Sequence, residues 1–393
     1  MLNKNTIYLL LFIGLFFLII LESFLSLIFV VFIISYFIKP NKISNILFVA
    51  CMASIIALVN SIRFPTHDGI NYINDYLGLM TTSFAHKTDI GFYLVNNIIY
   101  SISNGNEQFF MFFWSFVFYF NMILSLYILY KSKILSYKAF ILSSLIFIAS
   151  PMYMVMSTHL IRQFVSESFF ALSLALYVTS NKKYYISLIF MVLTHFASLI
   201  FLPFFLYKKI RYRLSIATLL VMVLLTITVG NVNIFILLND VINIISVDLG
   251  VYSSMIESAA KVHDDDGNVS HRVYVLSIIS ILYLFYLVYY KKKYRYVFIF
   301  NLLLISFLIF NALVSVQLLW LRFSFYQYIF YPIVFGIMIT NIYDRYIKIF
   351  SFLLILLYGL KFIFFFENMN WVHENKKEQL FDKGVTYFLN VKK

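Results

Sequence analysis

Long apolar blocks, separated by short clusters of basic residues, dominate the chain from end to end. A helix needs about 20 mostly apolar residues to cross the hydrocarbon core of a bilayer. Blocks of this kind lie near residues 7–21, 23–38, 43–62, 109–130, 139–156, 160–180, 214–230, 272–290, 296–316, 323–342 and 347–366. The first two, separated by Glu22, could instead form one bent helix, and we expect an uncleaved anchor there because no cleavage pattern follows. The pattern predicts an all-α polytopic membrane protein with about eleven transmembrane helices in a single integral membrane domain, residues 1–393.

Basic residues predict the orientation of these helices. If the helices alternate in direction, the basic clusters fall on one face, and by the positive-inside rule that face is the cytoplasm. The clusters are Lys39/Lys42, Lys131/Lys133/Lys138, Lys182/Lys183, Lys208/Lys209/Arg211/Arg213, Lys291/Lys292/Lys293/Arg295 and Arg345/Lys348. The outer face then receives the loops of about 63–108 and 231–271 and the C-terminal tail 367–393. Within the first loop, residues 89–103 predict an amphipathic helix that is either interfacial or partly inserted into the membrane.

Residues 184–206 do not fit simple alternation, because they lie between two basic clusters yet are long enough for only one span. A single span would put one cluster on the outer face. Two half-helices that turn near His195 keep both clusters inside, so we expect a re-entrant helical hairpin here. Irregular backbone at this depth is tolerated only against protein or a water-filled cavity.

Composition supports the membrane assignment and excludes several functions. The chain is 62% hydrophobic and 12% charged, whereas a soluble domain has roughly 25% charged residues. Cytoplasmic loops account for the net charge of +13, so we expect no nucleic-acid partner. A single cysteine, Cys51, excludes an intramolecular disulfide and a multi-cysteine metal site. The sequence contains no phosphate-binding loop, dinucleotide fingerprint or zinc-protease motif, and we expect neither a metal nor another cofactor.

Four isolated arginines depart from the positive-inside pattern. Arg63, Arg162, Arg272 and Arg322 all fall at predicted outer ends of spans, outside the lysine-rich clusters. Each one alone could simply extend toward lipid headgroups. The planar guanidinium, however, binds phosphate oxygens through two hydrogen bonds, whereas lysine acts as a hydrated point charge. The set is therefore typical of a site that binds a pyrophosphate at the membrane surface.

His195 is the strongest candidate for a catalytic base. It lies in the middle of the apolar segment LTHFASLIFLP. An ionisable group at membrane depth is costly and marks a functional site more often than a packing position. Neutral imidazole is also the usual general base near pH 7. The alternative is a hydrogen-bonded histidine of the core.

Two polar segments of the outer face complete the candidate site. The segment Ser157–Gln163 opens a helix, on which His159 and Arg162 share a face. An ion pair inside that helix, between Arg162 and Glu167, is the alternative. The further candidates are Gln163 from this segment and His67 and Asp68 from the first outer loop.

Five short segments carry a family resemblance by their order and spacing. They are RFPTHDGINY at 63–72, DIGFY at 89–93, Arg162-Gln163, HFAS at 195–198 and RFSFY at 322–326. The set resembles the EpsG family of bacterial polysaccharide-biosynthesis membrane proteins, which act as Wzy-type polymerases, and covers roughly residues 45–335. The chain departs from the family pattern in the order Asp68-Gly69 and at Asp89, where the family has glutamate.

The resemblance implies an enzyme that joins oligosaccharide repeat units carried on undecaprenyl pyrophosphate at the outer face of the bacterial inner membrane. The growing chain leaves its lipid pyrophosphate and moves to a hydroxyl of a new lipid-linked unit. On this interpretation His195, Arg162 and Asp68 are catalytic, and the substrate-binding residues are Arg63, Arg322, Arg272, Gln163, His159 and His67. The implied partners are the lipid-linked glycan, membrane lipid, a chain-length regulator and a flippase.

Two other functions stay open at this point. A membrane glycosyltransferase that uses undecaprenyl-phosphate sugars would use an acidic base, for which Asp68 is the candidate. A lipid-linked oligosaccharide flippase or another secondary transporter would show pseudo-symmetry between the two halves of the chain. We find no internal repeat in the sequence.

Overall fold

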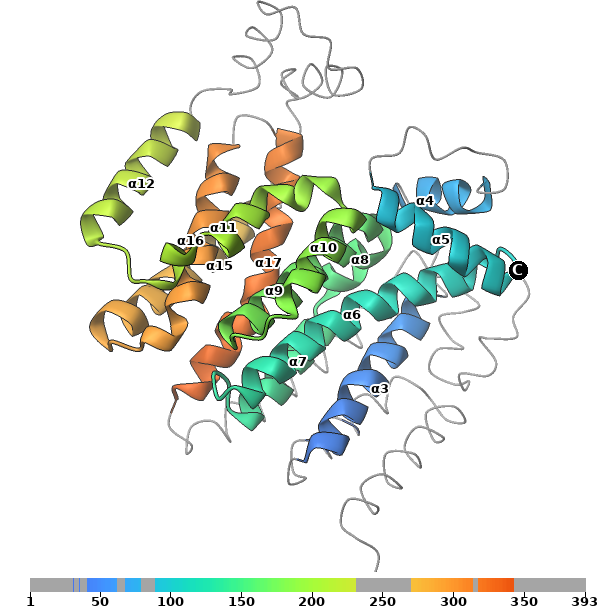
Figure 1. Ribbon diagram of the computed structural model, residues 1–393, viewed down its shortest axis with the longest axis horizontal. Helices are drawn as coiled ribbons and strands as arrows, with labels where there is room; N and C mark the ends of the chain where they lie inside the picture. Colours follow the sequence, from blue (N-terminus) through green and yellow to red (C-terminus); the bar gives the residue numbers. More distant parts are fainter. Residues whose placement is uncertain are drawn as a thin grey trace, which may run out of the picture. The chain divides into compact units, whose positions relative to one another are not determined.

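The computed structural model describes residues 41–61, 68–78, 89–230, 270–313 and 317–342, together with Val31 and Ser35. Every regular element within these ranges is helical, as the apolar blocks predict (Figure 1). By its internal contacts the chain divides into two compact units, Met1–Leu202 with Phe335–Lys393, and Pro203–Val334. The single integral membrane domain stays a prediction. The blocks near 7–21, 23–38 and 347–366 and the tail 367–393 lie outside the described residues, apart from Val31 and Ser35.

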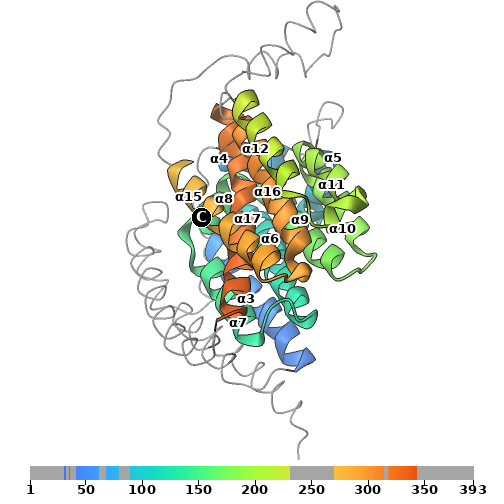
Figure 2. The same ribbon diagram turned by 90° about the vertical axis from the view of Figure 1, so that its left-hand side faces the viewer.

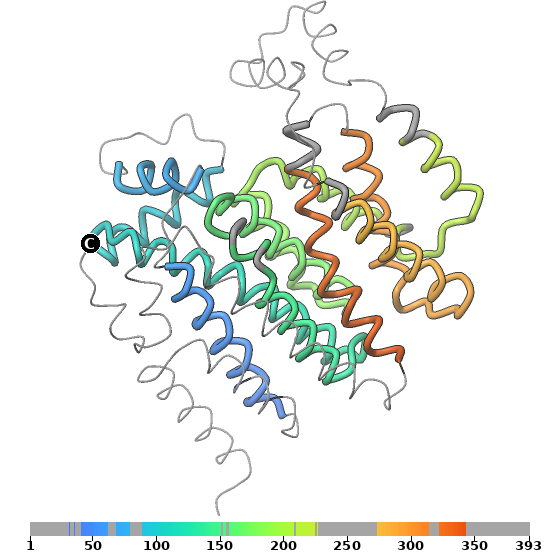
Figure 3. The backbone as a smooth tube through the Cα atoms, turned by 180° about the vertical axis from the view of Figure 1, so that it is seen from behind, coloured from blue at the N-terminus to red at the C-terminus, as the bar shows by residue number. Residues whose placement is uncertain are grey.

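In the first unit, helix α6 packs between other helices and is linked to one of them by a polar contact. Its described helices are α3 (Lys42–Ser61), α4 (Asp68–Leu77), α5 (Ile90–Ser103), α6 (Glu107–Lys131), α7 (Tyr137–Ala149), α8 (Pro151–His159), α9 (Ile161–Val178), α10 (Tyr184–Thr194) and the 3-10 helix η2 (Phe196–Phe201). Helix α6 packs on both α3 and α9, and α9 packs in turn on α10 (Figure 3). The Asn121 amide donates to the Ser168 hydroxyl at 3.2 Å and so links α6 to α9. Such pairing matters because an unpaired polar group is costly in an apolar surrounding.

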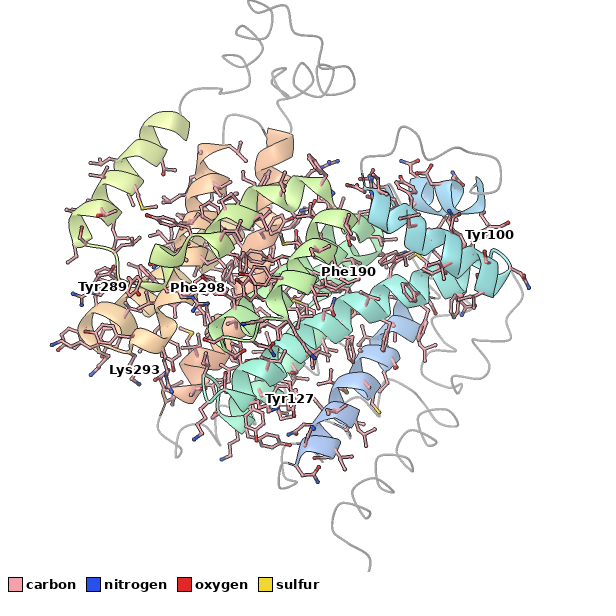
Figure 4. All side chains as sticks on the ribbon, in the orientation of Figure 1. Tyr100, Tyr127, Phe190, Tyr289, Lys293 and Phe298 are labelled. Atoms are coloured by element: carbon pink, nitrogen blue, oxygen red, sulfur yellow. The ribbon has the colours of Figure 1, made fainter. Side chains whose placement is uncertain are left out.

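The predicted amphipathic helix at 89–103 is confirmed as α5, although its place at the membrane interface stays a prediction. Aliphatic side chains at every fourth position form its exposed face: Ile90, Leu94, Ile98 and Ile102. The opposite face is buried, and there Phe92 stacks on Trp114 of α6 with ring centroids 4.7 Å apart. Tyr100, labelled in Figure 4, contacts Tyr76 of α4 at 5.3 Å between centroids. Helix α4 itself was not predicted.

The polypeptide breaks at His195, as the sequence predicts. Helix α10 ends at Thr194, and His195 is extended, with φ −151° and ψ 107°, before the chain continues as η2. The Met191 carbonyl accepts hydrogen bonds from the hydroxyls of Ser166 at 2.8 Å and Ser198 at 3.1 Å, and from the His195 N–H at 3.2 Å. Bonds of this kind are what allow an irregular backbone inside a membrane protein. That the two short helices form a re-entrant hairpin stays a prediction.

The second unit is also helical. Its elements are α11 (Leu202–Leu206), η3 (Lys208–Arg211), α12 (Ile216–Gly230), α15 (Ser270–Phe285), the π-helical turn η4 (Tyr286–Tyr290), η5 (Tyr294–Tyr296), α16 (Val297–Ala312) and α17 (Gln317–Thr340). Helix α11 begins one residue before this unit, and the end of α17 belongs to the first unit. Helix α12 lies against α16 (Figure 2). The Gln327 amide nitrogen donates to Ser306 at 2.8 Å, and its oxygen accepts from Ser277 at 3.3 Å. One buried side chain thus links α15, α16 and α17.

Five helices in the described ranges are long and apolar enough to cross a membrane. They are Lys42–Ser61, Glu107–Lys131, Val273–Tyr290, Tyr294–Ala312 and Arg322–Thr340. The total rises to six if α7 and α8, bent by 62°, form a single broken span; Pro151 at the start of α8 accounts for the break. Helices α9 and α12 occupy predicted blocks but are not among the five. The number of about eleven spans is therefore not confirmed.

The orientation in the membrane can be tested by cysteine labelling. In a Cys51→Ser background, cysteines at Ser83 and Asp265 should react with an impermeant maleimide in intact spheroplasts. Cysteines at Lys131 and Ser132 should not react, because the positive-inside rule puts the end of α6 in the cytoplasm. Reaction on the opposite sides would show that the predicted orientation is inverted.

Candidate functional site

A buried carboxylate, Asp89, joins three segments of the first unit. Its Oδ2 atom accepts a hydrogen bond from Arg162 Nη1 at 2.7 Å, and its Oδ1 atom accepts one from the backbone N–H of Phe196 at 2.8 Å. The same Oδ2 atom lies 3.6 Å from His195 Nδ1. The Asp89 side chain is only 4% exposed, compared with 28% for Arg162 and 17% for His195. The start of α5, the start of α9 and the break after α10 therefore meet at one charged group.

The local sequence explains how Asp89 reaches this position. Asp89 precedes the first residue of α5, but its side chain makes no capping hydrogen bond to that helix, so both oxygens are directed to other segments. Two residues later, Gly91 lies directly against Leu193 near the end of α10. A Cβ atom on Gly91 would lie 2.6 Å from Leu193 Cβ and 2.9 Å from the Leu193 carbonyl oxygen. Glycine is what lets α5 approach the break closely enough for these contacts.

Replacement of Gly91 by alanine should destabilise the protein by about 1–3 kcal/mol, because the added methyl group overpacks the contact with backbone and side chain of Leu193. It should also lower activity by moving Asp89 away from Phe196. The melting temperature in detergent, followed by loss of the monodisperse peak on heating, measures the first effect. Gly78→Ala is the matched control, since a Cβ there meets nothing within 4 Å. Equal melting temperatures for the two variants would contradict the packing argument.

The Arg162 guanidinium is held in place but not fully engaged. It lies over the ring of Tyr72 in α4, 5.0 Å from the centroid, in a favourable cation–π contact. The hydroxyl of Tyr93 donates to Asp75 at 3.0 Å and fixes α4 against α5. Arg162 Nε, in contrast, is buried and has no hydrogen-bond partner among the described residues. The side chain thus keeps a free donor beside its ion pair.

Charges around Asp89 keep this carboxyl ionised. Burial by itself raises its pKa, but the adjacent His195, the charge of Arg162 and the N–H of Phe196 together outweigh burial, so the pKa of Asp89 lies below its ordinary value. The ion pair is present above that pKa and is lost only as the pH falls through it. Removal of one partner of a buried pair is strongly destabilising because the other charge stays buried without compensation. The pair should therefore persist in mildly acidic surroundings.

The structure brings together two of the predicted catalytic residues, Arg162 and His195, through Asp89. The third, Asp68, begins α4 one helical turn before Tyr72, the residue that covers Arg162. Gln163 is buried and donates to Glu167 Oε1 at 2.9 Å. The alternative of an ion pair between Arg162 and Glu167 is therefore wrong, because Arg162 pairs with Asp89 instead.

The structure does not test the other predicted site residues. His159 is the last residue of α8. Arg63 and His67 lie outside the described residues. Arg272 in α15 and Arg322 in α17 belong to the second unit. The gathering of four arginines around one cavity stays a prediction, as do the substrate-binding roles of all these residues.

Two residues of the site were missed as functional candidates, Asp89 and Tyr72. Both lie in segments that carry the family resemblance, DIGFY and RFPTHDGINY. The available signal for Asp89 was an acidic residue directly before an amphipathic helix, two positions ahead of a glycine. Its partners lie 73 and 107 residues away along the chain, so local sequence could not identify them. Within the described residues, no three His, Cys, Asp or Glu side chains are grouped as metal ligands would be.

Comparison with known protein families shows which family the chain belongs to. The model of the EpsG family matches residues 46–377, which is more than half of the sequence. The chain belongs to the EpsG family. It is accordingly a membrane protein of polysaccharide biosynthesis, from a family associated with glycosyltransferase-like activity. Comparisons with curated proteins and with solved structures gave no match.

Proposed function

We propose that this EpsG-family protein is a polymerase that joins oligosaccharide repeat units carried on undecaprenyl pyrophosphate, at the outer face of the bacterial inner membrane. The observation that carries the proposal is one buried carboxylate, Asp89, that binds a guanidinium and lies beside an imidazole. Glycosyl transfer from a lipid pyrophosphate needs two kinds of help. The leaving pyrophosphate must be stabilised, and the attacking hydroxyl must lose its proton.

Arg162 is suited to stabilise the leaving group. As the glycosidic C–O bond breaks, the bonding electrons pass to the pyrophosphate, and the developing negative charge needs donors that are already in place. Tyr72 and Asp89 fix the guanidinium before substrate arrives. The side chain is partly exposed, and a guanidinium can donate two parallel hydrogen bonds to phosphate oxygens.

His195 is suited to accept the proton of the acceptor hydroxyl. Its Nδ1 atom faces the Asp89 carboxylate at 3.6 Å, and a hydrogen bond from Nδ1 to this carboxylate would select the tautomer that carries hydrogen on Nδ1. The lone pair is then on Nε2, where it can take the hydroxyl proton while the hydroxyl oxygen bonds to the anomeric carbon. In the serine-protease triad an aspartate orients the histidine through a hydrogen bond of this kind.

Deletion of the gene, followed by gel analysis of the surface glycan, tests the proposal. We expect the ladder of polymer lengths to disappear while a single repeat unit is retained, because the units are still made and exported. Complementation with the wild-type gene should restore the ladder. Loss of all surface glycan, with the lipid-linked unit trapped on the cytoplasmic side, would instead assign the protein as a flippase.

A further inference from the structure

Two side chains compete for one oxygen of Asp89. Oδ2 is hydrogen-bonded to Arg162 Nη1 at 2.7 Å, while His195 Nδ1 lies 3.6 Å from the same atom. Hydrogen bonds from nitrogen to oxygen are about 2.7–3.2 Å long, so the second distance is too long for one. His195 Nδ1 is accordingly buried and has no hydrogen-bond partner among the described residues. The imidazole is next to its orienting group without being bound to it.

The other oxygen of Asp89 is anchored on the histidine side of the site. Oδ1 accepts the backbone N–H of Phe196, the residue that follows His195. If Arg162 were drawn away, Oδ1 could stay in place while Oδ2 turned toward Nδ1. The movement needed is small, because the present distance exceeds hydrogen-bond length by only a few tenths of an ångström.

A phosphate group that enters the site would compete with Asp89 for the Arg162 guanidinium. The Arg162 side chain is 28% exposed, whereas the Asp89 side chain is 4% exposed, so an anion that approaches the site reaches the guanidinium before the carboxylate. An anionic phosphate that binds two nitrogens of the guanidinium together forms a two-point contact that the single bond to Asp89 does not match. The phosphate would replace Asp89 as the counter-ion of the guanidinium.

We propose that Asp89 is a positioning residue that transfers its Oδ2 hydrogen bond from Arg162 to His195 when Arg162 binds the pyrophosphate of the lipid-linked substrate. The inference rests on the proposed function and adds the order of events. His195 is oriented as a base only after the pyrophosphate leaving group is bound. An imidazole that is not oriented in the empty site is a poor base toward water. The transfer thus links substrate binding to activation of His195.

Nitrogen NMR of the histidine side chains can follow the transfer directly. The full-length protein is labelled with ¹⁵N-histidine in lipid nanodiscs, and the His195 signals are assigned by their absence in His195→Gln. Geranyl pyrophosphate is the probe, and broadening of its ³¹P signals reports binding. In the wild type, the probe should shift His195 toward the tautomer with hydrogen on Nδ1. Arg162→Gln should show this tautomer without the probe, and Asp89→Asn should never show it.

The outcomes separate this inference from the proposed function. If the probe binds but the His195 signals do not change, or change equally in Asp89→Asn, the transfer is wrong while the pyrophosphate site stands. If the probe does not bind, both proposals fail. If Arg162→Gln keeps the resting His195 signals of the wild type, the competition for Oδ2 is wrong. Arg213→Gln is the matched control, because Arg213 also lies over a tyrosine ring, Tyr289, at 5.1 Å, and its loss should not alter the His195 signals.

Discussion

His195→Gln should lower polymer formation by about 10²–10⁴-fold, the usual contribution of general-base catalysis. Glutamine can still form one hydrogen bond at the break after α10, so the fold should survive. Its amide cannot take up a proton, and the acceptor hydroxyl would have to react without a base. The measurement is polymer formation by the purified variant with lipid-linked repeat units, normalised to the amount of folded protein.

Thr194→Val is the matched control for this variant. Thr194 is the last residue of α10, and its hydroxyl donates only to the Phe190 carbonyl of its own helix, at 2.6 Å. The substitution changes the same break in the chain but leaves the imidazole intact, and its turnover should stay near normal. Near-normal turnover in His195→Gln itself would exclude His195 as the base and leave Asp68 and His159 as candidates.

The sequence predicted the long helices well because their signal is local. Helices such as α3, α6 and α16 are apolar over the whole length needed to cross a bilayer. Helix α4 gave no such signal, since Asp68–Leu77 is short and includes polar residues at positions that face away from the core. Helix α9 shows the converse difficulty. It lies where a span was predicted, yet its buried positions include Gln163 and Glu167, which pair with each other inside the unit.

The candidate site was predictable only in part. Some of its residues are unusual in their local sequence, whereas Asp89 is defined by contacts between distant segments. Arg162 and His195 are noticeable in the sequence as ionisable groups at the edge or in the middle of apolar segments. Asp89 is not noticeable, since its role depends on contacts with residues that are distant in sequence. Those contacts depend in turn on the close packing of Gly91 on Leu193, which no periodicity reveals. Sequence patterns identify which residues are unusual, whereas packing decides which of them meet.

Arg162→Lys should lower polymer formation by about 10²–10³-fold, the loss typical when one preorganised donor to a developing negative charge is removed. Lysine keeps the positive charge, so simple attraction of an anion to the membrane surface would be preserved. What it lacks is the planar fork, which bonds to Asp89 in the empty site and can offer two nitrogens to one phosphate when substrate binds. The expected loss thus tests geometry rather than charge, and the length distribution of the surface glycan in a deletion strain measures it.

Arg213→Lys provides the comparison at matched protein level. Arg213 lies over the ring of Tyr289 at 5.1 Å, much as Arg162 lies over Tyr72 at 5.0 Å, but it belongs to a predicted cytoplasmic cluster. Its replacement should leave the ladder unchanged. A full ladder from Arg162→Lys would show that the guanidinium only extends toward lipid headgroups. In that case the ion pair with Asp89 would only join the start of α5 to the start of α9, and the pyrophosphate would have to be bound elsewhere.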